Sequence, residues 1–253
     1  MTEHTIGSVQ DRGLSAVTTD QPSPTDLSVR ALRRRWKPTK ERLADSDRHE
    51  PIRIRIHRTC SWLQRVEEIE PESASDTGLI FRWIALNSLY GIWDDDAGQP
   101  TPDREALESF LDMVAEIDRE ELLPAILEEH RDLVMSVFDD EYLTTMFWKN
   151  PTERQAKLAR KTRFSANTWY LEKRYRLILD QVVGRIYFLR CQLIHGGATL
   201  GSKLNRDAVS RCATMLGHLL PTVVVIMIDH GVDEDWGPLC YPPMRASDGH
   251  SGG

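Results

Sequence analysis

The sequence predicts an all-α protein. Apolar residues recur at intervals of three and four along most of the chain, and no segment shows sustained two-residue alternation. Neither an internal repeat nor a Gly-rich phosphate loop is present. The 253 residues suit one domain with flanking tails, so we expect an up-and-down helical bundle that carries an inserted acidic helical layer.

Composition narrows the class of protein. The net charge is -7. The four cysteines form no C-x-x-C pair, so we expect neither a zinc site nor a disulfide framework. We expect no metal or cofactor. The N-terminus does not resemble a signal peptide, and the most apolar stretch, 219–228, is shorter than the roughly 20 residues that cross a bilayer. We therefore expect a cytoplasmic protein that does not contact a membrane.

Residues 1–48 are polar and contain Pro22, Pro24 and Pro38, which predicts a disordered N-terminal arm. The end of this arm is basic, and its cations are Arg30, Arg33, Arg34, Arg35, Lys37, Lys40 and Arg42. Two interpretations stay open for it, contact with phosphates or a solubilising tail.

The helical domain is predicted over 49–232. Ile52, Ile56 and Leu63 follow the spacing of one helix face, and a break around 71–78 separates this helix from 79–93, which is apolar on nearly every side and is expected at the centre of the core.

The segment 94–148 is predicted to be an acidic helical insertion. It has seventeen Asp or Glu residues between Asp94 and Glu141 against three arginines, and its apolar spacing predicts a pair of amphipathic helices. We expect a charged layer that is appended to the bundle and repels phosphates.

The next segment, 153–176, is basic, and Trp169, Tyr170 and Tyr175 are interleaved with its cations. Cations and aromatic rings together are typical of surfaces that bind single-stranded nucleic acid, and Lys173 and Arg174 are candidate substrate-binding residues. The alternative interpretation is a solvated helix face.

A long helix is predicted over 177–194, where Gly196 and Gly197 provide a glycine stop signal. A final helix starts near Asn205 or Asp207 and runs to about His230, and 233–253 is predicted to be a flexible tail.

The end of the helix over 177–194 carries the candidate chemistry. Arg190 is permanently charged and can bind phosphate oxygens bidentately, while the imidazole of His195 can move protons near neutral pH. Residues five apart differ by about 140° around a helix, so the pair would meet near the helix end or between two copies of the chain. Alternatively, His195 only stabilises the helix C-terminus and Arg190 is a surface charge.

This segment resembles the signature of the HEPN family (higher eukaryotes and prokaryotes nucleotide-binding), small helical domains in which four to six residues separate an arginine from a histidine. Arg190 and His195 match that motif, Tyr187 and Gly196 match its extended form, and 81–91 looks like the early core helix of some bacterial members. The resemblance implies a homodimer that acts as a metal-independent endoribonuclease, as a toxin or antiphage effector, with RNA and an antitoxin or other protein as partners.

Under this resemblance His195 would transfer the proton during attack by the 2′-hydroxyl, and Arg190 would stabilise the negative charge. Tyr187 and Cys191 are expected to contact substrate. Asn87, a polar residue in an apolar helix, is expected either to bond another helix or to reach the site.

Two alternatives remain. Many catalytic members have Asn or Asp where this chain has Cys191, which favours a non-catalytic nucleotide- or RNA-binding and dimerisation module. Cys191 and His195 are also four residues apart, the spacing at which an imidazole could activate a thiol nucleophile.

Overall fold

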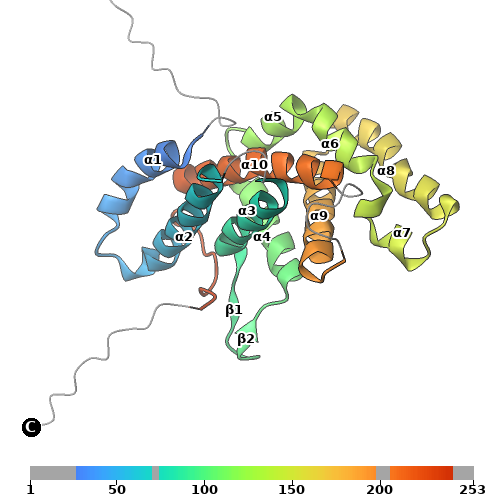
Figure 1. The fold of residues 1–253 in the computed structure, drawn as a ribbon. Coiled ribbons are helices and arrows are strands. Elements are labelled where there is room, and N and C mark those ends of the chain that lie inside the picture. Colours follow the sequence, from blue (N-terminus) through green and yellow to red (C-terminus); the bar gives the residue numbers. More distant parts are fainter. Residues whose placement is uncertain (1–26, 70–73, 198–205, 242–253) are drawn as a thin grey trace, which may run out of the picture.

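The computed structural model describes residues 27–69, 74–197 and 206–241, and its fold is all-α, as predicted (Figure 1). The helices are α1 Val29–Arg42, α2 Glu50–Glu67, α3 Ala74–Tyr90, α4 Asp103–Ile117, α5 Leu122–Glu129, α6 Arg131–Phe138, α7 Thr145–Lys149, α8 Glu153–Leu171, α9 Tyr175–Ile194 and α10 Arg206–His230. Two 3-10 turns, η2 Asp47–His49 and η4 Glu141–Leu143, and two short strands, β1 Trp93–Asp94 and β2 Gln99–Pro100, complete the described elements. The HEPN-like arrangement of the bundle stays a prediction.

Helix α10 lies at the centre of the molecule and contacts α1, α3, α4, α5, α6 and α9. Its second half is buried on every side, from Leu219 to Ile228. Within the described residues it is the one helix long and apolar enough to cross a membrane, but 78% of its most apolar window is buried inside the fold. The burial identifies α10 as a core helix, as the sequence predicts.

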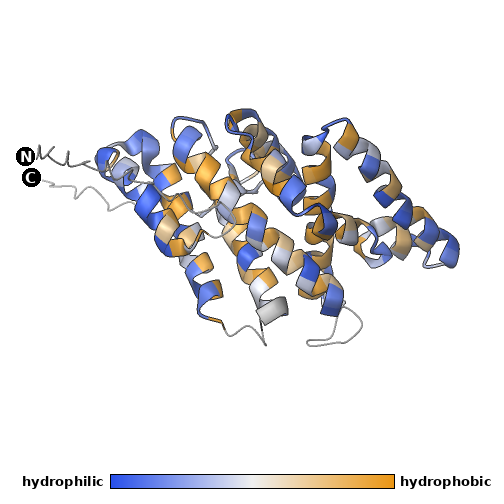
Figure 2. Cartoon of the chain, turned by 90° about the horizontal axis from the view of Figure 1, so that it is seen from above, coloured by the Kyte–Doolittle hydropathy of each residue, from blue (hydrophilic) through white to orange (hydrophobic). Residues whose placement is uncertain are grey.

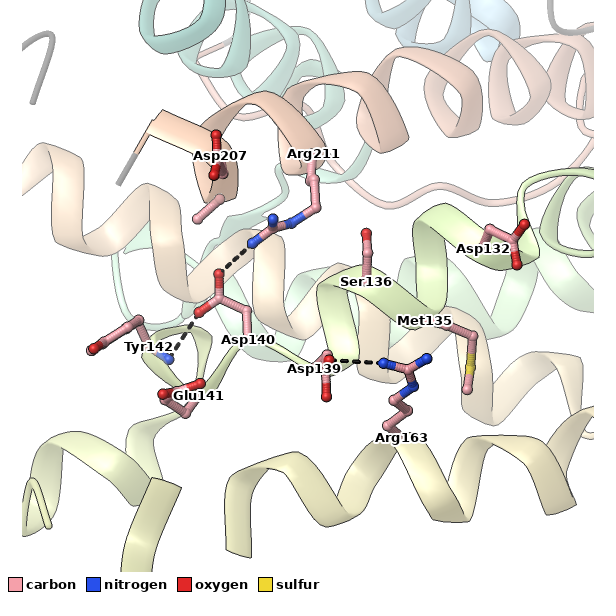
Figure 3. A pocket seen from close by; sticks show the side chains of 11 residues that line it. Asp132, Met135, Ser136, Asp139, Asp140, Glu141, Tyr142, Arg163, Asp207 and Arg211 are labelled. Atoms are coloured by element: carbon pink, nitrogen blue, oxygen red, sulfur yellow. Dashed lines mark hydrogen bonds and ion pairs between the residues drawn. The ribbon is translucent and has the colours of Figure 1, made fainter. Parts of the chain in front are cut away.

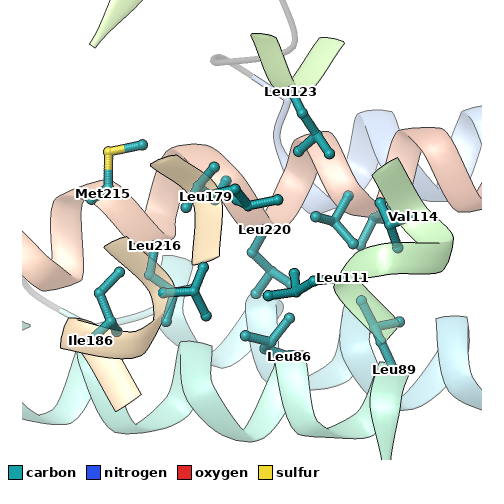
Figure 4. Close-up of a cluster of buried hydrophobic side chains, with 14 of the residues drawn as sticks. Leu86, Leu89, Leu111, Val114, Leu123, Leu179, Ile186, Met215, Leu216 and Leu220 are labelled. Carbon is teal, nitrogen blue, oxygen red and sulfur yellow. The ribbon is translucent and has the colours of Figure 1, made fainter. Parts of the chain in front are cut away.

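The core is one continuous cluster that reaches from α1 to α10. Figure 4 shows leucines of α3, α4, α5, α9 and α10 packed together, among them Leu89, Leu111, Leu123, Leu179 and Leu220. Most helices carry hydrophilic and hydrophobic residues on different sides, which is visible from above in Figure 2.

The acidic segment is not an appended layer, so that prediction is wrong. Val114, Leu127 and Val137 of α4, α5 and α6 are fully buried in the shared core. The predicted pair of amphipathic helices is three helices, because the second one is interrupted at His130 between α5 and α6. Charge is confined to the outer faces, which is why composition alone suggested a separate layer.

The predicted disordered arm is wrong for residues 29–48, while residues 1–26 lie outside the described residues. Val29, Leu32 and Trp36 are buried along one face of α1, and Arg35 makes an ion pair with Asp229 of α10. Their spacing of three and four is helical, but the surrounding arginines dominate the composition. Helix α1 is therefore part of the bundle.

The predicted flexible tail is wrong for residues 233–241. The guanidinium of Arg55 in α2 is buried and donates to the carbonyls of Leu89 and Gly91 at the end of α3. It also donates to three carbonyls of the C-terminal segment, those of Trp236, Gly237 and Pro238. Burial lowers the pKa of Arg55 to about 10. These hydrogen bonds attach the segment to the bundle.

The predicted helix over 79–93 ends at Tyr90, because residues 93–94 pair with 99–100 in an antiparallel ribbon. Leu239 forms a bridge to Ile92, so the start of this ribbon also contacts the C-terminal segment. Helix α4 begins at Asp103, three residues after the ribbon ends. Asp103 belongs to the candidate site.

Candidate functional site

Helix α9 ends in a complete Schellman motif. The N–H of Gly196 donates to the carbonyl of Leu193 (3.2 Å), the N–H of Gly197 donates to the carbonyl of Gln192 (2.7 Å), and Gly196 has φ 71°. The predicted glycine stop is confirmed. His195 occupies the C-cap position, and its side chain is exposed to solvent.

Arg190 is held inside a network that connects three helices. Its Nη1 lies 3.4 Å from Oδ2 of Asp103 in α4, and the hydroxyl of Tyr90 in α3 donates to Oδ1 of the same carboxylate (2.6 Å). The guanidinium also lies 5.9 Å from the ring centroids of Trp83 and Tyr187. This network orients Arg190 towards α3 and α4, while 23% of its side chain stays exposed.

Two tyrosines of this network are electrostatically perturbed. The pKa of Tyr90 is raised, mainly by burial and then by the neighbouring Asp103 carboxylate, so its phenol stays protonated and donates. The pKa of Tyr187 is raised by partial burial first and by Cys191 second. The ring of Tyr187 packs edge-on against Trp83, with centroids 5.7 Å apart.

The side chain of Cys191 contacts its neighbours in this network. Nη1 of Arg190 lies 3.8 Å from the Cys191 Sγ, and Tyr187 lies one turn earlier on α9. The His195 N–H donates to the Cys191 carbonyl (3.0 Å) as part of the helix, but within the described part of the chain no side-chain contact joins Cys191 to His195. The thiol-nucleophile alternative therefore has no geometric support here beyond the helical spacing.

Two other candidate residues, Lys173 and Arg174, lie at the opposite end of α9 from His195. Lys173 and Arg174 precede α9, and the length of that helix separates them from His195 by roughly 30 Å at 1.5 Å per residue. The fold therefore does not bring Lys173 and Arg174 to the end of α9. Asn87 lies on α3 one turn after Trp83, but its Oδ1 is directed towards Gly91, 3.2 Å from where a Cβ on that glycine would lie.

Trp169, Tyr170 and Tyr175 of the basic segment are engaged elsewhere, whereas Phe164 of α8 is exposed. The Tyr170 hydroxyl donates to the carbonyl of Leu127, the Tyr175 hydroxyl donates to Glu128, and Trp169 packs edge-on against Phe138. These contacts fix α8 and α9 against α5 and α6. The rings are therefore part of the packing between helices and do not form an exposed stacking surface.

Sequence reasoning missed Trp83, Tyr90 and Asp103 as partners of Arg190. They come from two other helices, and no local pattern connects them to the motif. It also missed an exposed aromatic cluster on η4 and α7, where Tyr142, Phe147 and Trp148 have ring centroids 5.1 to 6.2 Å apart. Gln192 of α9 donates to the Tyr142 carbonyl (2.8 Å), so this cluster borders the last turn of α9.

A groove of about 320 Å³ runs along the middle of α9. Gly184 is exposed at its floor, a Cβ there would meet no atom within 4 Å, and Tyr187 and Phe188 line the same groove. Within the described residues, no group of three or more His, Cys, Asp or Glu side chains is arranged to hold a metal ion.

Comparison with protein-family models, curated proteins and solved structures finds no match. The function therefore has to be argued from the site itself.

Proposed function

We propose that this protein is an endoribonuclease of the HEPN type, cleaving single-stranded or loop RNA without a metal ion in a cleft formed by two copies of the chain. A role as a toxin or antiphage effector follows from such an activity. The observation that carries the proposal is the end of α9, where His195 is exposed on a rigid Schellman terminus and Arg190 is held less than two turns away.

Each side chain has a role suited to its surroundings. His195 accepts the proton of the 2′-hydroxyl as that oxygen attacks the adjacent phosphorus, which forms a 2′,3′-cyclic phosphate and breaks the bond to the 5′-oxygen. The departing 5′-oxygen takes a proton from water and leaves as a hydroxyl. Arg190 faces the non-bridging phosphate oxygens and stabilises their charge. The aromatic rings of Trp83 and Tyr187 restrict the guanidinium, so less freedom is lost when phosphate binds.

A second copy of the chain would complete the cleft. Gly184, Phe188, Cys191 and His195 follow one another at intervals of four, three and four, so they lie along one stripe of α9. The open space at Gly184 allows close approach along this stripe. Two such helices related by a two-fold axis would bring Arg190 of one copy towards His195 of the other.

The test is cleavage of a mixed RNA pool in EDTA by wild type, His195→Ala and Arg190→Ala. His57→Ala is a matched control, because His57 is also exposed but lies on α2. Cleavage by wild type and by His57→Ala, with none by His195→Ala or Arg190→Ala, supports the proposal. Cleavage that survives in His195→Ala refutes the role of that histidine in proton transfer.

Mixing the two inactive variants tests the shared cleft. An Arg190→Ala and His195→Ala heterodimer keeps one composite site with both wild-type side chains, so activity should return after subunit exchange. If the variants form dimers and the mixture stays inactive, Arg190 and His195 act within one chain.

A second candidate function is a non-catalytic module that binds RNA or nucleotides and dimerises. Cys191 favours it, because many catalytic members of the family that the motif resembles have Asn or Asp directly after the arginine. RNA binding without cleavage by the wild-type dimer would select this second function.

A further inference from the structure

The outer surface beside the end of α9 combines exposed aromatic rings with lysines. Tyr142 is 45% exposed, Trp148 is 50% exposed and Phe164 of α8 is 74% exposed. Lys149 follows Trp148 directly, and Lys157 and Lys161 are exposed on α8. We refer to this set as the aromatic–basic surface: Tyr142, Trp148, Lys149, Lys157, Lys161 and Phe164.

The aromatic part of this surface is rigid. The indole N–H of Trp148 donates to the carbonyl of Tyr142 (2.9 Å), and both rings pack against Phe147. The Tyr142 carbonyl also accepts from Gln192 in α9. The rings are therefore presented to solvent in one arrangement, and Gln192 lies one turn before His195.

The basic part lies next to the aromatic part because Arg160 connects α8 to η4. Its guanidinium makes an ion pair with Glu141 (2.8 Å), the residue before Tyr142. Lys157 and Phe164 lie three residues before and four after Arg160, so they flank it on adjacent turns of α8. Lys161 follows Arg160 on the exposed side.

Three acidic residues nearby, Asp139, Asp140 and Glu141, are paired with arginines, whereas Glu153, one turn before Lys157, makes no ion pair within the described residues. Asp139 pairs with Arg163 (2.8 Å) and Asp140 pairs with Arg211 (2.6 Å), as drawn in Figure 3, where they line a polar cavity of about 570 Å³. Lys149, Lys157 and Lys161, by contrast, make no ion pair within the described ranges. The positive charge on this surface is therefore available to an anionic ligand.

We propose that the aromatic–basic surface binds single-stranded RNA, with nucleobases stacked on Trp148 and Tyr142 and phosphates contacted by Lys149, Lys157 and Lys161. Stacking tolerates every base because each has a π-face, and the lysines add attraction that does not depend on sequence. Gln192, which donates to the Tyr142 carbonyl, lies one turn before His195. The surface therefore lies where it can guide RNA towards that histidine. This inference rests on the proposed function, since it takes the RNA of that reaction as the ligand.

The experiment measures the binding of a fluorescent single-stranded oligonucleotide by the full chain carrying His195→Ala, so that the RNA stays intact. In this background Trp148→Leu should weaken binding by about five-fold or more, whereas Trp148→Phe, which keeps an aromatic ring, should bind nearly normally. Lys157→Ala with Lys161→Ala should weaken binding and flatten its salt dependence. Arg119→Ala, which removes an exposed positive charge between α4 and α5, is the matched control.

The outcomes separate this inference from the proposed function. Binding that is unchanged in Trp148→Leu and in the double lysine variant overturns the aromatic–basic surface and leaves RNA cleavage standing. A protein that neither binds nor cleaves RNA overturns the proposed function and the surface together. If Trp148→Leu and Trp148→Phe differ in sedimentation and not in RNA binding, the cluster is a protein interface and the inference is wrong.

Discussion

Asp103 connects Tyr90 to Arg190. One carboxylate oxygen accepts from the buried phenol at 2.6 Å, and the other lies 3.4 Å from the guanidinium. Because Asp103 is the first residue of α4, the segment expected to be an appended acidic layer supplies the side chain that orients the motif arginine. The position of Arg190 therefore depends on α3, α4 and α9 together.

Removing this carboxylate should release Arg190. We expect Asp103→Ala to bind RNA several-fold more tightly in fluorescence anisotropy, since the guanidinium loses its competing anion. The variant should also lose about 1–3 kcal/mol of unfolding free energy, because the Tyr90 hydroxyl is left without an acceptor. Tyr90→Phe is the control: it removes the same hydrogen bond and keeps the ion pair, so its RNA affinity should stay unchanged, and an equal gain in both variants would contradict the argument.

The Schellman terminus should be sensitive at Gly196. Its φ of 71° disfavours any residue with a Cβ, so Gly196→Ala should destabilise the protein by about 1 kcal/mol in urea unfolding. Gly196→Asn should cost less, because Asn tolerates the left-handed region better. Equal stability of wild type and Gly196→Ala would show that α9 does not need this end geometry.

The acidic segment should unfold together with the rest of the bundle. Leu127 of α5 is fully buried in the shared core, so Leu127→Ala should cost about 2–5 kcal/mol. Thermal unfolding followed by circular dichroism and by tryptophan fluorescence should shift by the same amount. Two separate transitions would instead support an independent layer.

The ion pair between Glu141 and Arg160 predicts a pH dependence. The hydrogen bond from Arg160 holds the pKa of Glu141 below its ordinary value of 4.5. The contribution of the ion pair to the free energy of unfolding is therefore complete above pH 4.5. It is lost as the pH falls through the lowered pKa of Glu141 in the folded state. The small stability difference between wild type and Arg160→Gln should be present at pH 7 and disappear in acid, and a difference that grows in acid would contradict this sign.

Much of the helical pattern could be predicted from the sequence, because burial of one face imposes a spacing of three and four. The helix over 177–194 with its glycine stop, and the final helix up to His230, follow directly from local signals. Helix α1 was missed because arginines surround its three buried positions, and burial is decided by the partners on α2 and α10. The attachment of 236–238 was missed for a similar reason, since it depends on Arg55, far away in sequence.

The sequence by itself determined the helical class, the position of Arg190 and His195 at the end of α9, and the backbone geometry of that end. Those features are local, because hydrogen bonds and glycine conformation act over a few residues. The tertiary structure decided which side chains surround Arg190 and which aromatic rings are exposed. It paired Arg190 with Asp103, used Tyr170 and Tyr175 in packing, and exposed Tyr142 and Trp148 beside α9. Such contacts join residues from different helices, and only the packing of the whole core sets which of them meet.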